Sequence, residues 1–196
     1  MITETLIIAK EYESLKDWKL VEQTIKENNL LMKIKESTFK REFVEIKKRL
    51  STLNQPQLSL LINGDLDETK AMIFLSLVKT YAFFFDFINE VVRNKYLMFD
   101  YLLTDSDYIK FFNAKSFTHD ELNNISEKTA KKVKQVVFKL MEQIGLINNT
   151  KNGSIFKPMI SDKVLKAIIN DNPEYLTVFF YQAEEIKNLK NKMKHV

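Results

Sequence analysis

The hydrophobic pattern of the chain is dominated by one stretch, residues 65–98, in which apolar side chains predominate and neither proline nor glycine occurs. It opens with Asp65 and Glu68, which have the spacing of a helix-capping pair. Apolar residues occupy most of the circumference that a helix would have here, and a narrow stripe carries the charges. The pattern predicts a long central helix that other helices cover over most of its surface.

Three charges within this stretch argue against a membrane-spanning helix. A span needs about 20 mostly apolar residues, but Lys79, Asp86 and Glu90 all fall inside residues 71–92. Each charge near the centre of a bilayer costs about 2.5–3.5 kcal/mol. The first residues also lack the basic and apolar regions of a signal peptide. We therefore expect a cytoplasmic protein without membrane contact.

Four shorter helices are predicted before the central one, from amphipathic spacing and from start signals. They cover residues 3–14, 17–28, 37–53 and 56–62. The third of them has the clearest two-sided pattern. Its expected inward stripe consists of Phe39, Phe43, Ile46 and Leu50. Its outer face carries Lys40, Arg41, Lys47, Lys48 and Arg49.

After residue 98 the pattern changes to two short helices and a longer one, expected at residues 105–113, 118–124 and 127–144. Their start signals are Thr104, a capping box that begins at Thr118, and Ser126. Gly145 can end the longer helix in the left-handed conformation. Two more helices begin at Ser161 and Asn172, and a lysine-rich tail that is expected to fray follows.

A β-hairpin is predicted directly after the longer helix. Residues 146–147 and 154–156 are strand candidates, and Asn152-Gly153 between them is a strong type I′ turn signal. The order of two short helices, a long helix and a hairpin is that of a winged helix-turn-helix, with residues 127–144 as its recognition helix. The inward stripe expected on that helix is Val133, Val136, Val137, Leu140, Met141 and Ile144.

Basic residues on the opposite face of the same helix are candidates for contact with duplex DNA. Lysines can bind phosphates, and a glutamine can read an adenine edge in the major groove. The candidates are Lys128, Lys131, Lys132, Gln135 and Lys139, with Lys151 and Lys157 on or beside the wing. An ordinary solvated lysine face, or a protein-docking module, remains open from the same residues.

Composition supports a helical protein with room for a real core. The chain has 196 residues, three glycines, three prolines and no cysteine, so disulfides and cysteine-bound zinc are excluded. We expect an all-α fold: a helical bundle around a long central helix, with a C-terminal winged-helix-like part that carries a short β-hairpin. The expected domains are a bundle at 1–100, the winged-helix-like part at 101–183 and a basic tail at 184–196.

Charge is modest overall, at +4, but it is unevenly distributed. Residues 33–49 hold seven Lys or Arg against three Glu, and residues 126–157 hold seven Lys against two Glu. Residues 54–125 hold ten acidic side chains against six basic ones. Segregation of this kind points to an anionic partner. Lys40, Arg41, Lys47 and Lys48 in the first basic block therefore join the candidate DNA contacts.

The sequence gives little support to catalysis, and an enzyme is the third interpretation after DNA binding and a scaffold. The two histidines, His119 and His195, are far apart, and the three glycines fit turns or caps rather than a phosphate-binding loop. The aspartates at 100, 105 and 107 are better explained by helix-start chemistry than by a metal site. We expect no enzyme activity, no catalytic residue, no metal and no cofactor.

Several segments, in order and spacing, resemble the small A component of bacteriophage-exclusion (BREX) systems. They are Glu4 to Ala9, Asp17-Trp18, Glu27 to Leu31, Arg41-Glu42-Phe43, Lys48-Arg49-Leu50, Phe111 to Lys115 and Ser126 to Ile147. The resemblance implies a DNA-binding protein without enzymatic activity. It provides no catalytic or ligand residues, so the basic candidates above rest on the residues alone. The family has carried an inner-membrane label, which the charges within 71–92 contradict.

The combined expectation is a DNA-binding accessory protein of a phage-defence system, with double-stranded DNA and other BREX components as partners. The alternative is a scaffold subunit that links larger defence components. The sequence leaves the DNA site, its base preference and the oligomeric state open.

Overall fold

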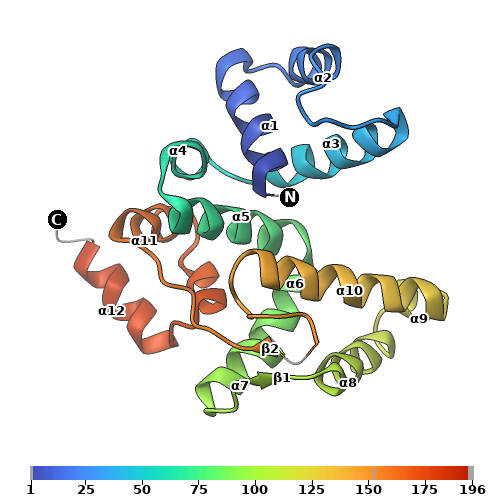
Figure 1. The fold of residues 1–196 in the computed structure, drawn as a ribbon. Helices are drawn as coiled ribbons and strands as arrows, with labels where there is room; N and C mark the ends of the chain where they lie inside the picture. Colours follow the sequence, from blue (N-terminus) through green and yellow to red (C-terminus); the bar gives the residue numbers. More distant parts are fainter. Residues whose placement is uncertain (1, 152, 194–196) are drawn as a thin grey trace. The chain divides into compact units, whose positions relative to one another are not determined.

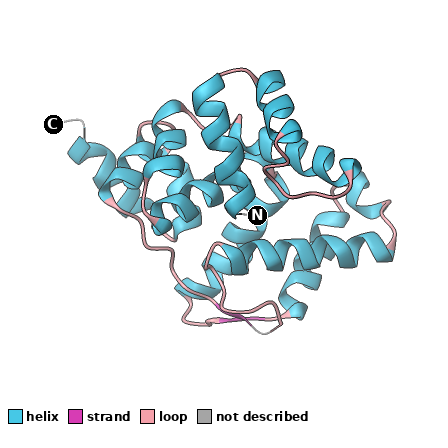
Figure 2. Cartoon of the chain, turned by 45° about the horizontal axis from the view of Figure 1, so that its top comes forward, coloured by secondary structure: helices cyan, strands magenta, loops and turns pink. Residues whose placement is uncertain are grey.

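The computed structural model describes residues 2–151 and 153–193 (Figure 1). These residues are mostly helical, with one small antiparallel sheet (Figure 2). The predicted all-α class with a short β element is thus confirmed. The chain forms two compact units. Unit 1 contains the residues up to Thr80 together with Ile160–Asp171, and unit 2 contains Tyr81–Met159 together with the residues from Asn172 onward. The domains expected at 1–100, 101–183 and 184–196 stay a prediction.

Unit 1 is built around one buried helix, α5, whose residues from Glu68 to Val78 are almost all buried. The start of α5 is the capping pair predicted from the sequence: the Asp65 side chain accepts from the amide of Glu68, and the Glu68 side chain accepts from the amide of Asp65. The helices of unit 1 are α1 (Ile2–Leu15), α2 (Trp18–Glu27), α3 (Glu36–Leu50), α4 (Gln55–Asn63), α5 (Leu66–Thr80) and α11 (Asp162–Ile169).

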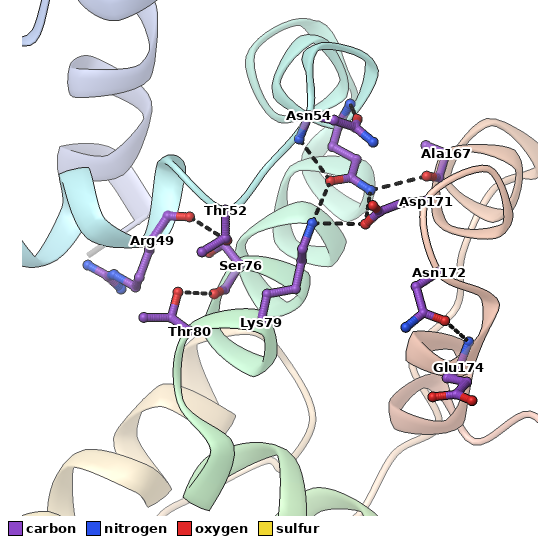
Figure 3. Close-up of polar contacts among 11 residues, drawn as sticks. Arg49, Thr52, Asn54, Ser76, Lys79, Thr80, Ala167, Asp171, Asn172 and Glu174 are labelled. Carbon is purple, nitrogen blue, oxygen red and sulfur yellow. Dashed lines mark hydrogen bonds and ion pairs between the residues drawn. The ribbon is translucent and has the colours of Figure 1, made fainter.

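A polar network joins α4, α5 and α11 inside unit 1 (Figure 3). Gln57, which is fully buried, donates to the carbonyl of Ala167 and to the carboxylate of Asp171, each at 3.1 Å. Lys79 lies 2.8 Å from the same carboxylate and 3.3 Å from the Gln57 carbonyl oxygen. Each buried polar atom here has a partner, which offsets the cost of removing it from water.

Unit 2 has an aromatic core beneath α6, α8 and α10. Phe87, which is fully buried, contacts Tyr108 and Phe111 at ring-centroid distances of 5.3 and 5.2 Å, and Phe138 at 6.4 Å. The helices of unit 2 are α6 (Ala82–Phe87), the π-helix η1 (Ile88–Arg93), α7 (Asn94–Leu97), α8 (Asp105–Ser116), α9 (Asp120–Asn123), α10 (Glu127–Gln143), the 3-10 helix η2 (Pro173–Phe179) and α12 (Ala183–Met193).

The prediction of one long central helix is wrong in one respect, because the helix is not continuous. It breaks at Tyr81, which has an extended backbone (φ −122°, ψ 100°), so that α5 belongs to unit 1 and α6, η1 and α7 belong to unit 2. Directly before the break, the Thr80 hydroxyl donates to the carbonyl of Ser76 (Figure 3), a contact that often bends a helix. Neither Gly nor Pro marks the break, which is why the pattern missed it.

None of the helices in the described ranges is, alone, long and apolar enough to cross a membrane. The stretches Leu66–Thr80 and Ala82–Leu97 meet the length and composition criteria only when taken together, as a pair with a sharp bend between them.

The predicted hairpin is only partly correct. The second strand, β2 (Gly153–Ser154), pairs antiparallel with β1 (Leu102–Leu103), which the sequence reading missed. The predicted partner contributes a single bridge, between Ile147 and Ile155. Asn152 lies outside the described residues, and Gly153 is in a strand rather than in a turn. A Cβ on Gly153 would lie 2.6 Å from the carbonyl oxygen of Asn149, so this position needs glycine for close backbone approach.

Helix starts were predicted well where a side chain caps the helix, and poorly elsewhere. Thr104 and Ser126 cap α8 and α10 as expected, and Gly145 adopts the left-handed conformation, with φ 80°. The capping box at Thr118 is wrong, because His119 is the N-cap of α9 and makes no side-chain cap bond. The segment expected to fray is helical as far as Met193.

Candidate nucleic-acid interface

The five residues predicted to share one face of α10 do so. Val137, Phe138 and Met141 anchor the opposite side in the core of unit 2. Ser126 begins the helix by accepting a hydrogen bond from the amide of Thr129. The exposed face carries Lys128, Lys131, Lys132, Gln135 and Lys139, all of them exposed.

Two of these lysines form ion pairs within the helix. Lys131 Nζ lies 2.8 Å from Glu127 Oε1, and Lys139 Nζ lies 2.8 Å from Glu142 Oε2. The hydrogen bond to Glu127 raises the pKa of Lys131 and keeps it charged. Exposed pairs of this type contribute about 0–1 kcal/mol, so a phosphate can replace the carboxylate at small cost. Lys128 and Lys132 form no ion pair with any residue in the described ranges.

The inward stripe of α10 needs one correction. Val136 was expected inside but is 49% exposed, whereas Phe138, absent from the predicted stripe, is 1% exposed. The Phe138 ring lies 6.0 Å from that of Tyr108 on α8 and 6.4 Å from that of Phe87 on α6. The neighbouring helices therefore cover α10 on one flank more than helical periodicity alone would indicate, and they leave Val136 on the opposite flank in solvent.

A groove of about 800 Å³ runs beside α10 in unit 2. Its walls are α10, the start of α8 and the loop that follows Gly145. It brings together three of the predicted residues: Gln135 and Lys139 of α10, and Lys151 of the loop. The other residues that line it are Thr104, Asp105, Ser106, Lys134, Phe138 and Thr150.

Lys134 was not predicted as a site residue, although it lines this groove. Its Nζ lies 2.6 Å from the Asp105 carboxylate at the start of α8. Helical spacing puts Lys134 on the border between the basic and the buried faces, so periodicity gave no reason to select it. The ion pair joins α8 to α10 and places one negative charge among the three lysines of the groove.

Lys157 does not line the groove. Its Nζ lies 4.9 Å from the centroid of the Tyr181 ring, in a cation–π contact. Lys151 is exposed, and its amide donates to the Asn149 side chain. Of the two lysines expected on or beside the wing, the structure thus places one in the groove and the other against an aromatic ring.

The basic residues of α3 form a separate surface on unit 1. Lys40, Arg41 and Lys48 are exposed, while Lys47 is half-buried, with its Nζ 5.6 Å from the centroid of the Trp18 ring. Arg49, expected on the outer face, is instead 7% exposed, and its Nε donates to the carbonyl of Glu45. The predicted inward stripe of α3 is buried throughout.

Within the described residues, the acidic and histidine side chains do not gather into a metal-binding cluster. Across residues 2–151 and 153–193, no three His, Asp or Glu side chains are placed to hold a metal ion. Asp100 and Asp107 instead contact Lys95, at 2.5 and 3.3 Å. His119 is exposed and its Nδ1 contacts the Thr118 hydroxyl at 2.9 Å. His195 lies outside the described residues.

Comparison with known proteins identifies the family. The BrxA family model matches residues 1–172. A BREX protein BrxA from Bacillus cereus (strain H3081.97) is 28% identical over 80% of this chain and 78% of its own length. One from Escherichia coli O9:H4 (strain HS) is 23% identical over 79% of this chain and 73% of its own length.

The fold also has a solved counterpart. A crystal structure of an uncharacterized protein from Magnetospirillum magneticum superimposes with a TM-score of 0.75, covering 91% of this chain and 92% of that one at 19% identity. At that identity the likeness shows the fold alone, and the family assignment rests on the sequence matches. The chain belongs to the BrxA family and is a component of a BREX phage-defence system.

Proposed function

We propose that this BREX component is a non-enzymatic accessory protein that binds duplex DNA through α10 and the neighbouring loop, in the manner of a winged helix-turn-helix. The observation that carries the proposal is the groove in which Gln135 and Lys139 of α10 meet Lys151 of the loop. A long exposed helix beside a basic loop fits the major groove and an adjacent phosphate backbone.

The arrangement of charge supports contact with phosphates rather than with a small anion. Lys128, Lys132 and Lys139 are spaced along one exposed face of a helix of 17 residues, which at 1.5 Å per residue extends over about 25 Å. Cations at such intervals match a repeating phosphate backbone. Gln135 on the same face has an amide that can pair with an adenine edge.

A second candidate function, protein docking, is favoured by three exposed apolar side chains in and beside the small sheet of unit 2. Leu102 and Phe156 are 48% and 49% exposed, and Phe99 is 80% exposed in a left-handed backbone conformation, with φ 61°. Large exposed apolar side chains of this kind mark interaction sites. A larger component of the same defence system is the partner that this alternative implies.

The test of the proposal is a titration of labelled duplex DNA at several salt concentrations. Each phosphate contact made by lysine contributes about −0.9 to the slope of log K against log salt. The quadruple change K128A/K131A/K132A/K139A should weaken binding and flatten the slope by up to about 3.6. Gln135→Ala removes no charge, so it should change sequence preference and leave the slope as it is.

A matched control removes four exposed lysines elsewhere: Lys10, Lys19, Lys163 and Lys166, all in unit 1. This control variant loses the same net charge as the α10 variant. If α10 is the DNA contact, the control should weaken binding far less, because its lysines lie elsewhere. Equal losses in both variants would point to a nonspecific charge effect. Parent protein that binds no duplex in a salt-sensitive way would overturn the DNA proposal, and capture of a BREX component that Phe156→Ser abolishes would then favour docking.

A further inference from the structure

Val136 is the one large apolar side chain of α10 that is exposed to solvent, at 49%. It lies at the border of the basic face: Lys132 and Lys139 are its neighbours at helical spacing on one side, and the half-buried Val133 and Leu140 are its neighbours on the other. The other apolar residues of this helix from Val133 onward are buried or half-buried. The basic face of α10 is therefore bordered by one apolar side chain, half of which the core leaves in solvent.

Val136 and Gln135 lie on opposite sides of a row of lysines on α10. Successive residues of a helix point about 100° apart, so the two side chains lie on opposite sides of the line of Lys128, Lys132 and Lys139. Gln135 lines the groove beside the loop, and Val136 does not. If these lysines contact the phosphate backbone, Gln135 and Val136 reach neighbouring base pairs rather than the same one.

The chemistry of the major groove offers one apolar group to a side chain at such a position. The edges of guanine, cytosine and adenine present donors and acceptors, whereas thymine adds a C5-methyl group. The two methyl groups of valine are held rigidly because the side chain is branched at Cβ, so little conformational freedom is lost on contact. Contact between the Val136 side chain and the thymine C5-methyl group removes apolar surface of both from water. This favours thymine over any other base at the position that Val136 reaches.

We propose that Val136 is a specificity-determining residue that contacts the C5-methyl group of thymine, so that α10 prefers A·T base pairs. The inference rests on the proposed DNA binding and deepens it. Burial of one methyl group corresponds to about a fourfold change in dissociation constant, since about 0.8 kcal/mol is gained per buried carbon. The preference should thus be modest and separable from the electrostatic part of binding.

The test compares two labelled duplexes of 20 base pairs, one of alternating dA and dT and one of alternating dA and dU. The second differs only by the missing methyl group at every thymine, so the binding site need not be known in advance. Parent protein should bind the thymine duplex about fourfold more tightly. Val136→Ala should reduce this ratio to near one, with the salt slope unchanged, and Val136→Thr, which keeps one methyl group, should preserve part of it.

The outcomes separate this inference from the proposal beneath it. Salt-sensitive binding with equal affinity for the two duplexes would overturn the thymine contact and leave DNA binding intact. The same holds if Val136→Ala retains the parent's ratio, because the discrimination would then come from duplex shape rather than from the side chain. Failure to bind either duplex would overturn both. Val136 is half in solvent, so its truncation should not unfold the protein.

Discussion

The basic face of α10 and the basic face of α3 look alike in the sequence and differ in the structure. Both are amphipathic helices with a buried stripe and four or five cationic or polar residues opposite. On α10, Lys128 and Lys132 are exposed without an ion pair to any described residue, and Gln135 and Lys139 line a groove. On α3, Lys47 contacts the Trp18 ring, Lys48 also has a protein partner, and Arg41 lines a pocket that contains carboxylates, among them Glu4 of α1.

We infer from this difference that the surroundings of a basic helix face, and not its charge alone, decide how easily its lysines can turn to a phosphate. A lysine that already contacts an aromatic ring loses part of that contact, worth about 0.5–1 kcal/mol at exposed sites, when it turns to a phosphate. A lysine in a weak surface pair loses almost nothing. We therefore expect α10 to supply most of the affinity for DNA.

The largest effects are expected from removing the core beneath each face. Phe87→Ala in unit 2 and Phe43→Ala in unit 1 should each lower the free energy of unfolding by about 3–5 kcal/mol, because the side chains are 0% and 1% exposed. Denaturant unfolding measures this. Of the two, Phe87→Ala should also impair DNA binding, since Phe87 contacts Phe138 of α10. Values near zero for both variants would show that the core of each unit is assigned incorrectly.

A sharper comparison is the quadruple change of Lys40, Arg41, Lys47 and Lys48 to alanine on α3. Because two of these four cations already have protein partners, the slope of log K against log salt should flatten by no more than about 1.8, or two contacts. The same anisotropy titration as for α10 measures it. A loss equal to that of the α10 variant would mean that α3 and α10 contribute alike to DNA binding.

The two units should also respond in the same direction to acid. Burial raises the pKa of Asp171, but the hydrogen bonds from Lys79 and Gln57 outweigh it, so the net pKa is lowered. For Asp107, burial is again opposed, by hydrogen bonds from Thr104 and Lys95, and its pKa is also lowered. A lowered pKa stabilises the folded state above the unfolded value of about 3.9, and this contribution is lost as pH falls through the folded value.

Asp171→Asn and Asp107→Asn should accordingly be less stable than the parent at pH 6, by about 1.5–3 kcal/mol, a value typical of a hydrogen bond to a charged group. The gap to the parent should narrow below about pH 3.9. Urea unfolding of the parent and of each variant, at pH 6 and below about pH 3.9, measures this difference in stability. A gap that is constant with pH would show that the carboxylates act through packing rather than through their charge.

The smallest expected effect concerns Lys47. Its alanine variant should lose about 0.5–1 kcal/mol of stability, because the contact with Trp18 disappears, whereas Lys132→Ala should change stability by no more than about 0.5 kcal/mol. Trp18 is the single tryptophan of the chain, so its fluorescence reports directly on this contact. An emission spectrum that Lys47→Ala leaves unaltered would show that the ring and the ammonium do not interact in solution.

The sequence predicted what depends on nearby residues and missed what depends on distant ones. Caps such as Asp65, Thr104 and Ser126 were found because a side chain and the amide it binds lie two or three residues apart. The stripe of α3 and the exposed face of α10 followed from helical spacing. The pairing of Leu102 with Ser154 crosses about 50 residues, and no local signal announces it.

In the candidate site, too, features set by nearby residues were predicted and features set by distant residues were missed. Membership of the basic face could be read from the sequence, but the groove could not, because it depends on where α8 and the loop pack against α10. Burial of Phe138 and exposure of Val136 have the same cause: contacts with Tyr108 and Phe87 displace the buried arc by part of a turn. Lys134 was overlooked because its partner, Asp105, is on another helix.

The return of α11 to unit 1 has a consequence for how the protein is made. Gln57 binds the carbonyl of Ala167, 110 residues later, and the carboxylate of Asp171, 114 residues later. At a synthesis rate of about 5–20 residues per second, the ribosome needs on the order of 5–20 s to make the chain between these partners. Until then Gln57 and Lys79 have to stay hydrated, and the buried side of α4 and α5 stays open. The first unit to be synthesised is therefore completed only after most of the second has left the ribosome.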